Sequence, residues 1–196
     1  MPRPSQAHQK RGDYLPVIAR AFAELGYRRT TTAELASRCA VRENILYRLW
    51  PDKKAMFIAA IDYVYDLSVR TWEHLLQNGR STPSASRLLG YEARHLGEFG
   101  HSRIIFAGLS ETDDPDIRRA LARMYRHYQG FVREQVRAHR AARGRARGTD
   151  PALAAWALVG LGTVSSIARE LHLLPDRHRR RLMVDIGTTL LDGRTG

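Results

Sequence analysis

ASRCAVRENILYRLW, residues 36–50, stands between TTTAEL at 30–35 and PDKKAM at 51–56, and it decides how this chain folds. Residues that favour helix lie on both sides of a break at Ala40 and Val41 that no proline or glycine marks. Two helices this short bury little surface and are marginal on their own. A pair of them joined by a tight turn predicts a helix-turn-helix, whose second helix reads base edges in the major groove of DNA.

The residue pattern places the ends and faces of this pair. Thr31 and Glu34 have the T-x-x-E spacing of a capping box, so the first helix is expected to start there, with Leu35, Ala36 and Cys39 turned inward. The second helix is expected from about residue 42, with its apolar residues Ile45, Leu46 and Leu49 turned toward the same core. The side chains left outside, where such a helix meets DNA, are Arg42, Glu43, Asn44, Tyr47 and Arg48.

Helical spacing continues on both sides of the pair. Asp13 is a suitable N-cap for a first helix, which places Pro16 in the first turn, and Gly26 ends that helix after Leu25. Further helices are expected at about 53–78, 83–99, 102–111, 115–141, 150–173 and 176–192. No run alternates apolar and polar residues, so strands are not expected and the predicted fold class is all-α.

Charge separates the chain into two regions. The formal net charge is +12, and residues 1–54 hold eleven Lys or Arg and five acids, which is +6 of that total. Such basicity is typical of nucleic-acid-binding proteins. The predicted organisation is an N-terminal helix-turn-helix DNA-binding domain at 1–52 and a larger helical domain at 53–196.

Several classes of site find no support. Cys39 is the only cysteine, which excludes an intramolecular disulfide or a cysteine-based zinc site. No HExxH pair and no glycine-rich phosphate loop occurs, and the carboxylates of ETDDPD are interpreted as helix caps. No catalytic residue, metal site or cofactor is therefore predicted. The N-terminal MPRPSQAHQKRG has no apolar core of a secretory signal, so a cytoplasmic protein without a membrane partner is expected.

The stretch from Tyr14 to Met56 resembles the DNA-binding domain of TetR-family transcriptional regulators. The shared pattern consists of Leu15, Phe22, Gly26, Thr31, Leu35, Ala36, Val41, Leu46, Tyr47, Trp50 and Lys53. Ala40 departs from it by replacing the usual turn glycine, and Arg42 by replacing the Ser or Thr that caps the next helix. An alanine in a left-handed turn is strained, so this turn is expected to have a different shape.

The resemblance implies a function and a set of DNA contacts. It implies a homodimeric repressor that binds a near-palindromic double-stranded DNA operator and is released by a small-molecule inducer. The implied DNA-binding residues are Thr31, Arg42, Glu43, Asn44, Tyr47, Arg48 and Lys53, with Tyr47 and Lys53 on phosphates. A helical ligand-binding protein or enzyme without DNA function is the alternative class, which turnover or ligand binding without DNA affinity would favour.

The resemblance also implies that the C-terminal domain holds the inducer. Ligand pockets are mostly apolar with a few polar groups. The candidate lining residues are Trp72, Tyr91, His95, Phe99, Phe106, Tyr125, Tyr128 and Trp156, although each of them could equally belong to a core.

PALAAWALVGLGTVSSIA, residues 151–168, carries no charge. Eighteen such residues reach the lower limit for a membrane-spanning helix, which leaves a membrane-tethered regulator as another alternative. Small and hydroxyl residues dilute the run, however, and a helix buried between protein layers is equally apolar. We therefore expect a dimer interface, built by this helix and the next, that includes Ala154, Ala157, Leu158, Leu161, Gly162 and Ser165.

Overall fold

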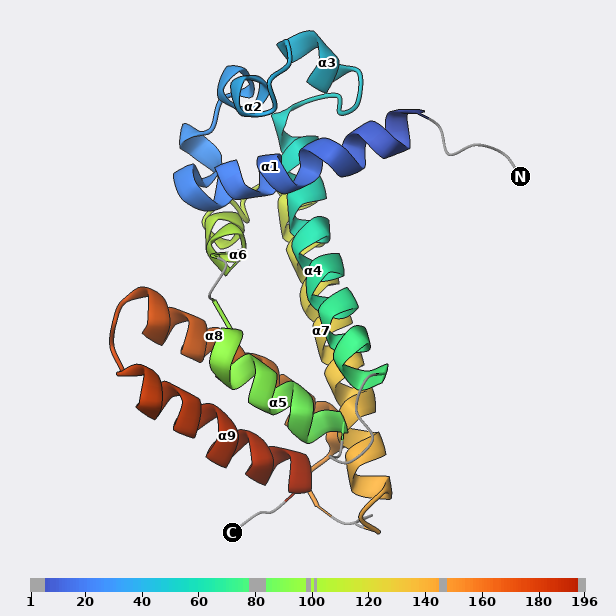
Figure 1. The fold of residues 1–196 in the computed structure, drawn as a ribbon, viewed down its shortest axis with the longest axis vertical. Coiled ribbons are helices and arrows are strands. Elements are labelled where there is room, and N and C mark those ends of the chain that lie inside the picture. Colours follow the sequence, from blue (N-terminus) through green and yellow to red (C-terminus); the bar gives the residue numbers. More distant parts are fainter. Residues whose placement is uncertain (1–5, 78–83, 98–99, 101, 145–147, 194–196) are drawn as a thin grey trace, which may run out of the picture. The chain divides into compact units, whose positions relative to one another are not determined.

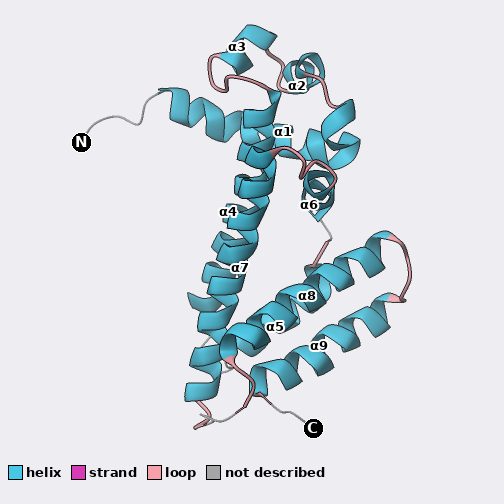
Figure 2. Cartoon of the chain, turned by 180° about the vertical axis from the view of Figure 1, so that it is seen from behind, coloured by secondary structure: helices cyan, strands magenta, loops and turns pink. Residues whose placement is uncertain are grey.

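A computed structural model describes residues 6–77, 84–97, 100, 102–144 and 148–193 (Figure 1). In these residues loops join α-helices and no strand occurs, which confirms the predicted all-α class (Figure 2). The helices are α1 (Gln6–Arg29), α2 (Thr32–Arg38), α3 (Glu43–Tyr47), α4 (Lys53–Gln77), α5 (Ser84–His95), α6 (Ser102–Leu109), α7 (Pro115–Ala141), α8 (Pro151–Glu170) and α9 (Asp176–Asp192).

The helices divide between two compact units. Unit 1 comprises Met1–Leu67 and Gly100–Met124, and unit 2 comprises Ser68–Phe99 and Tyr125–Gly196. Helices α4 and α7 contribute residues to both units. The compact units do not divide between residues 52 and 53, and the functional boundary expected there remains a prediction.

Unit 1 holds the helix-turn-helix on a buried aromatic and aliphatic core. Leu35 of α2 and Leu46 of α3 are fully buried, as their spacing predicted. Phe22 of α1 and Phe57 of α4 are also fully buried, and their rings meet edge to face with centroids 4.9 Å apart. Burial of each such side chain stabilises the fold by about 1.5–3 kcal/mol, which offsets the intrinsic weakness of the two short helices.

Helix α1 starts earlier than its capping pattern predicts. It begins at Gln6 rather than at Asp13, so Asp13 and Pro16 lie inside the helix and the predicted cap is wrong. Tertiary contacts support the additional turns, since the Arg11 Nε donates to the Leu49 carbonyl oxygen at 2.9 Å. Local propensity could not reveal this contact, because its partners are far apart in the sequence.

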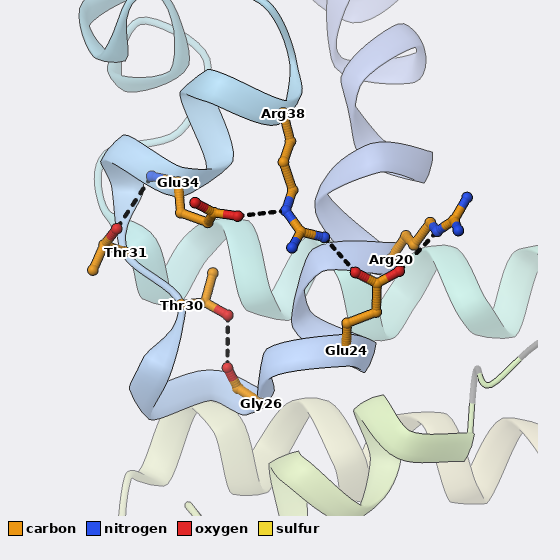
Figure 3. Close-up of polar contacts among 7 residues, drawn as sticks. All are labelled: Arg20, Glu24, Gly26, Thr30, Thr31, Glu34 and Arg38. Atoms are coloured by element: carbon orange, nitrogen blue, oxygen red, sulfur yellow. Dashed lines mark hydrogen bonds and ion pairs between the residues drawn. The ribbon is translucent and has the colours of Figure 1, made fainter.

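Gly26 breaks the helical conformation of α1, as predicted, and helical residues then resume up to Arg29. The φ of 76° and ψ of 169° at Gly26 break the helical conformation there, and Thr30 Oγ1 donates to the freed Gly26 carbonyl oxygen at 2.7 Å (Figure 3). A positive φ of this kind favours glycine.

A chain of ion pairs then joins α1 to α2. The Arg38 guanidinium contacts Glu34 at 2.7 Å and Glu24 at 2.5 Å, and Glu24 also pairs with Arg20 at 2.9 Å (Figure 3). Hydrogen bonds from Arg38 and then Arg20 hold the pKa of Glu24 below its usual value. Pairs this exposed contribute little to stability, so their main effect is on the direction in which α2 leaves α1.

In unit 2, α9 packs against both α5 and α8, and α8 and α9 run antiparallel beside one another (Figure 1). The core between them includes Leu89, Val136, Ala154, Met183 and Leu191. A Cβ atom at Gly187 of α9 would lie 2.5 Å from a methyl carbon of Leu89, so a larger residue there would force the Leu89 side chain to move.

The cap of α2 gives a test of the unit 1 fold. Thr31 has an extended backbone, and its Oγ1 accepts a hydrogen bond from the Glu34 amide at 3.1 Å, which confirms the predicted cap. Replacing it (Thr31→Ala) is expected to lower the free energy of unfolding by about 1 kcal/mol in urea titrations. The exposed mid-helix Ser37→Ala is the control, expected to change it by less than about 0.5 kcal/mol. Equal stability of the two variants would contradict the capping role.

Candidate nucleic-acid interface and a buried carboxylate

The turn between α2 and α3 is a left-handed turn in spite of its alanine. Helix α2 ends at Cys39, and Ala40 follows with a φ of 53°. The expectation of a differently shaped turn is therefore wrong. Two backbone hydrogen bonds hold the conformation, from the Ala40 amide to Ser37 and from the Val41 amide to Ala36, both at 3.0 Å. They offset the cost of about 1–2 kcal/mol that a left-handed conformation carries for an L-residue.

Helix α3 is short and presents polar side chains to solvent. Arg42 occupies the N-cap position and makes no side-chain capping hydrogen bond, as its departure from the family pattern suggested. The inward residue is Leu46, whereas the residues predicted to contact DNA are all exposed: Arg42, Glu43, Asn44, Tyr47 and Arg48. Tyr47 also donates its hydroxyl hydrogen bond to Thr32 Oγ1 at 3.1 Å, which joins α3 to the start of α2.

Lys53, predicted to contact phosphate, has partners within the protein. Its Nζ donates to the carbonyl oxygens of Tyr27 at 3.1 Å and Thr30 at 3.0 Å, and lies 4.4 Å from the centroid of the Tyr27 ring. The first turn of α4 is thereby fixed to the end of α1. Sequence reasoning missed this role, because backbone carbonyls that accept a hydrogen bond leave no residue pattern. A phosphate contact by Lys53 stays a prediction.

These features define a class of protein. Two short helices joined by a tight turn, with the polar side of the second exposed on a basic domain, are the features of helix-turn-helix DNA-binding proteins. Residues 15–60 match the family model described as bacterial regulatory proteins, tetR family. Residues 15–60 therefore form a DNA-binding domain of the TetR-family type.

Among curated relatives, the nucleoid occlusion factor SlmA of Citrobacter koseri is 26% identical over 148 residues, covering 74% of this chain and 75% of that protein. A TetR-family transcriptional regulator from Rhodococcus sp. has a TM-score of 0.80 at 18% identity, over 94% of this chain and 99% of that one.

Two other solved structures share this fold and contain ligands. A Saccharomonospora viridis transcriptional regulator in complex with choline has a TM-score of 0.75 at 17% identity, over 91% of this chain and 95% of that one. Bacillus subtilis FadR in complex with stearoyl-CoA has a TM-score of 0.71 at 14% identity, over 94% and 99%. Identities this low show a shared fold and leave the ligand of this chain open.

Unit 2 contains a carboxylate beside aromatic rings, and we call Glu92, Trp72, Tyr128 and Phe131 the Glu92 cluster. The Trp72 indole Nε1 of α4 donates to Glu92 Oε1 of α5 at 2.6 Å. The Trp72 ring lies 5.5 Å from that of Tyr128 and 5.0 Å from that of Phe131, both on α7. On α5 the rings of Tyr91 and His95 are 4.6 Å apart. Trp72 therefore links the carboxylate of Glu92 on α5 to two aromatic rings on α7.

Burial raises the pKa of Glu92 above its usual value. This effect outweighs the hydrogen bond from Trp72 and the attraction of His95, both of which act to lower the pKa. The cluster is nonetheless open to solvent in part, because Trp72, Glu92, Tyr128 and Phe131 all keep partial exposure. Burial therefore disfavours the charged form of Glu92, while the residue as a whole keeps part of its surface exposed.

The predicted ligand-lining residues have different locations. Trp72, Tyr91, His95 and Tyr128 belong to the Glu92 cluster or to the helix face beside it. Phe106 lies on α6 in unit 1, Tyr125 is half-buried on α7, Trp156 is 45% exposed on α8, and Phe99 lies outside the described residues.

Sequence reasoning overlooked Glu92 and Phe131. One signal for Glu92 was available, because it follows Leu88 and Leu89 at i+4 and i+3 and thus interrupts the buried side of α5 with an acid.

The residues predicted at the dimer interface also divide into two groups. Ala154 and Ser165 are fully buried within the protomer, and Leu158 and Leu161 pack against its core. Ala157 is exposed and Gly162 half-buried. The outer side of α8 is instead a stripe formed by Leu153, Trp156, Ala157, Gly160 and Val164, in which Leu153 is 62% and Val164 55% exposed. Helix α8 is also the one described helix long and apolar enough to cross a membrane, by length and composition alone.

The raised pKa of Glu92 predicts a pH-dependent stability. Between the ordinary pKa near 4.5 and the raised value, the folded state holds a proton that the unfolded state has lost, so this group destabilises the fold as pH rises. The isosteric Glu92→Gln, which keeps an acceptor for Trp72, is therefore expected to gain melting temperature relative to the wild type between pH 4.5 and pH 8. The exposed Glu73→Gln is the control. If the melting temperature of the wild type instead rose relative to that of Glu92→Gln with increasing pH, the charge on Glu92 would be stabilising.

Proposed function

We propose that this TetR-family regulator is a cytoplasmic homodimeric repressor that binds a near-palindromic operator and leaves it when a small molecule occupies unit 2. The observation that carries the proposal is the exposed polar side of α3, with Arg42, Asn44 and Arg48 free of core packing. Regulators of this family act by binding DNA rather than by catalysis, and we assign no catalytic residue.

The DNA contacts follow from the chemistry of the α3 side chains. Arg48 and Arg42 can donate to the acceptors of guanine, and Asn44 can make the paired hydrogen bonds that distinguish adenine. Tyr47, held by Thr32, and Lys53 and Thr31 at helix starts are proposed to contact phosphates. The excess of basic residues in 1–54 adds a non-specific attraction that weakens with salt.

The dimer is proposed to form through the exposed stripe of α8 together with α9. Leu153, Trp156 and Val164 leave an apolar surface of the kind that soluble monomers seldom expose. Gly160 at its middle has nothing within 4 Å of an added Cβ atom, so a partner helix could approach closely there. Pairing α8 and α9 with their copies gives a two-fold four-helix interface, which suits an operator whose half-sites are one DNA turn, about 34–36 Å, apart.

Ligand response is proposed as a coupling between two binding equilibria. If a small molecule weakens operator binding by some factor, the operator must weaken binding of that molecule by the same factor. Choline and stearoyl-CoA occupy two proteins of this fold and differ in charge and size. The class of ligand must therefore be read from this chain's own residues.

The DNA prediction separates two kinds of contact. After selection of a bound sequence from random DNA, Asn44→Ala and Arg48→Ala are expected to lose about 1–3 kcal/mol of discrimination against altered sites. Tyr47→Phe and Lys53→Gln are expected to weaken binding to every sequence, measured by fluorescence anisotropy.

Lys53 needs its own control because it also holds α1. A lost phosphate contact reduces the salt slope by about one, whereas a loosened α1 end lowers the melting temperature and leaves the slope unchanged. Selection that enriches no sequence at moderate salt would overturn the proposed function.

The dimer prediction uses a charge at the exposed stripe. Val164→Glu is expected to shift sedimentation from dimer to monomer and to remove tight operator binding, since two carboxylates would face each other near the two-fold axis. Helical content is expected to stay unchanged, because Val164 is exposed in the protomer. Leu109→Glu, at a similarly exposed apolar residue on α6, is the matched control. A wild type that sediments as a stable monomer would rule out this interface.

A further inference from the structure

The Glu92 cluster holds a carboxylate whose charged form is disfavoured by burial. Its recorded hydrogen-bond donor is the neutral indole of Trp72, and burial acts against its charge. An acid in this setting is usually replaced by an apolar residue unless a positive group reaches it. His95, one turn along α5, attracts Glu92 but lies beside Tyr91 with its ring 4.6 Å from that ring.

The aromatic rings of the cluster offer a second attraction for positive charge. The Trp72 ring centroid lies 5.5 Å from that of Tyr128 and 5.0 Å from that of Phe131, and the same Trp72 indole contacts the carboxylate. Ring faces carry negative potential and bind ammonium and quaternary ammonium groups, most strongly at tryptophan and out of bulk water. Carboxylate and rings together select for an organic cation and against an anion.

Access to the cluster is also recorded. The three rings and Glu92 all keep partial exposure, in contrast to the fully buried Val136 and Ala154 of the same unit. The inference requires a small cation to reach the buried carboxylate past these partly exposed side chains. Tyr128 further donates its hydroxyl hydrogen bond to Ser68 Oγ at 3.2 Å, which fixes this ring on the α4 side.

We infer that Glu92, with the rings of Trp72, Tyr128 and Phe131, binds an organic cation such as an ammonium or quaternary ammonium compound. The inference deepens the proposed function, since it names the chemical class of molecule to which the regulator responds. Glu92 supplies the counter-charge, and the three rings exclude water and contact the alkyl groups of the cation.

Unit 2 also contains a candidate site for an anionic ligand. Arg179 of α9 is fully buried, and its Nε and Nη1 have no hydrogen-bond partner in the described part of the chain. A fatty acid carboxylate is the anion that would satisfy it. Stearate therefore serves as the opposing probe.

The experiment measures binding to the whole 196-residue chain by calorimetry, with four probes. These are choline, tetraethylammonium, stearate and 3,3-dimethylbutan-1-ol, which is the uncharged isostere of choline. We expect saturable binding of at least one cation and at least ten-fold weaker binding of the uncharged alcohol. Glu92→Gln is expected to weaken cation binding at least ten-fold, while the exposed Glu73→Gln on α4 leaves it unchanged.

Several outcomes would overturn the inference. They are binding of neither cation, equal binding of choline and its isostere, equal affinity in the Glu92→Gln variant, or binding of stearate alone. A melting curve of each variant excludes loss of folding as the cause.

Operator binding is measured separately by anisotropy. A cation that binds through Glu92 without releasing DNA supports the inference and overturns induction. A protein that selects a DNA sequence but binds no cation keeps its DNA-binding role and refutes the inference.

Discussion

The helix-turn-helix depends on the burial of two leucines that its own helices cannot protect. Helices α2 and α3 have seven and five residues, too few to persist in water. Leu35 and Leu46 are fully buried in unit 1, and so are Phe22 of α1 and Phe57 of α4. That burial leaves the opposite side of α3 exposed and polar, and DNA reading is the use that such a surface serves.

Polar contacts at the edge of this apolar core fix the path of the chain from α1 into α2. Gly26 breaks α1, Thr31 caps α2 and Arg38 joins the two helices, so the chain enters the pair along a defined path (Figure 3). Lys53 of α4 acts in the same way, because its Nζ donates to the carbonyl oxygens of Tyr27 and Thr30 at the end of α1 and just after it. A lysine in this position can be held by protein or by phosphate, and both uses place its charge at the same helix end.

Unit 2 differs from unit 1 because two of its features are energetically unfavourable in the protomer. The stripe on α8 is apolar and exposed, and the charged form of Glu92 is disfavoured by burial. Both features cost free energy in an isolated protomer. A second protomer would relieve the first and an organic cation the second, so the proposed dimer and the proposed ligand each supply what the protomer lacks.

Local chemistry in the sequence was enough to determine the helical class, the cap at Thr31, the break at Gly26 and the exposed residues of α3. Each of these depends on residues within a few positions of one another, where spacing reports geometry directly.

Contacts between distant residues settled the rest. The early start of α1 relies on the contact between Arg11 and Leu49. Ala154 and Ser165 could not be separated from Leu153 and Val164 by composition, since an uncharged helix does not reveal which of its sides meets the core. Glu92 gained its environment from Trp72, Tyr128 and Phe131 on two other helices, and only folding brings those rings to the acid.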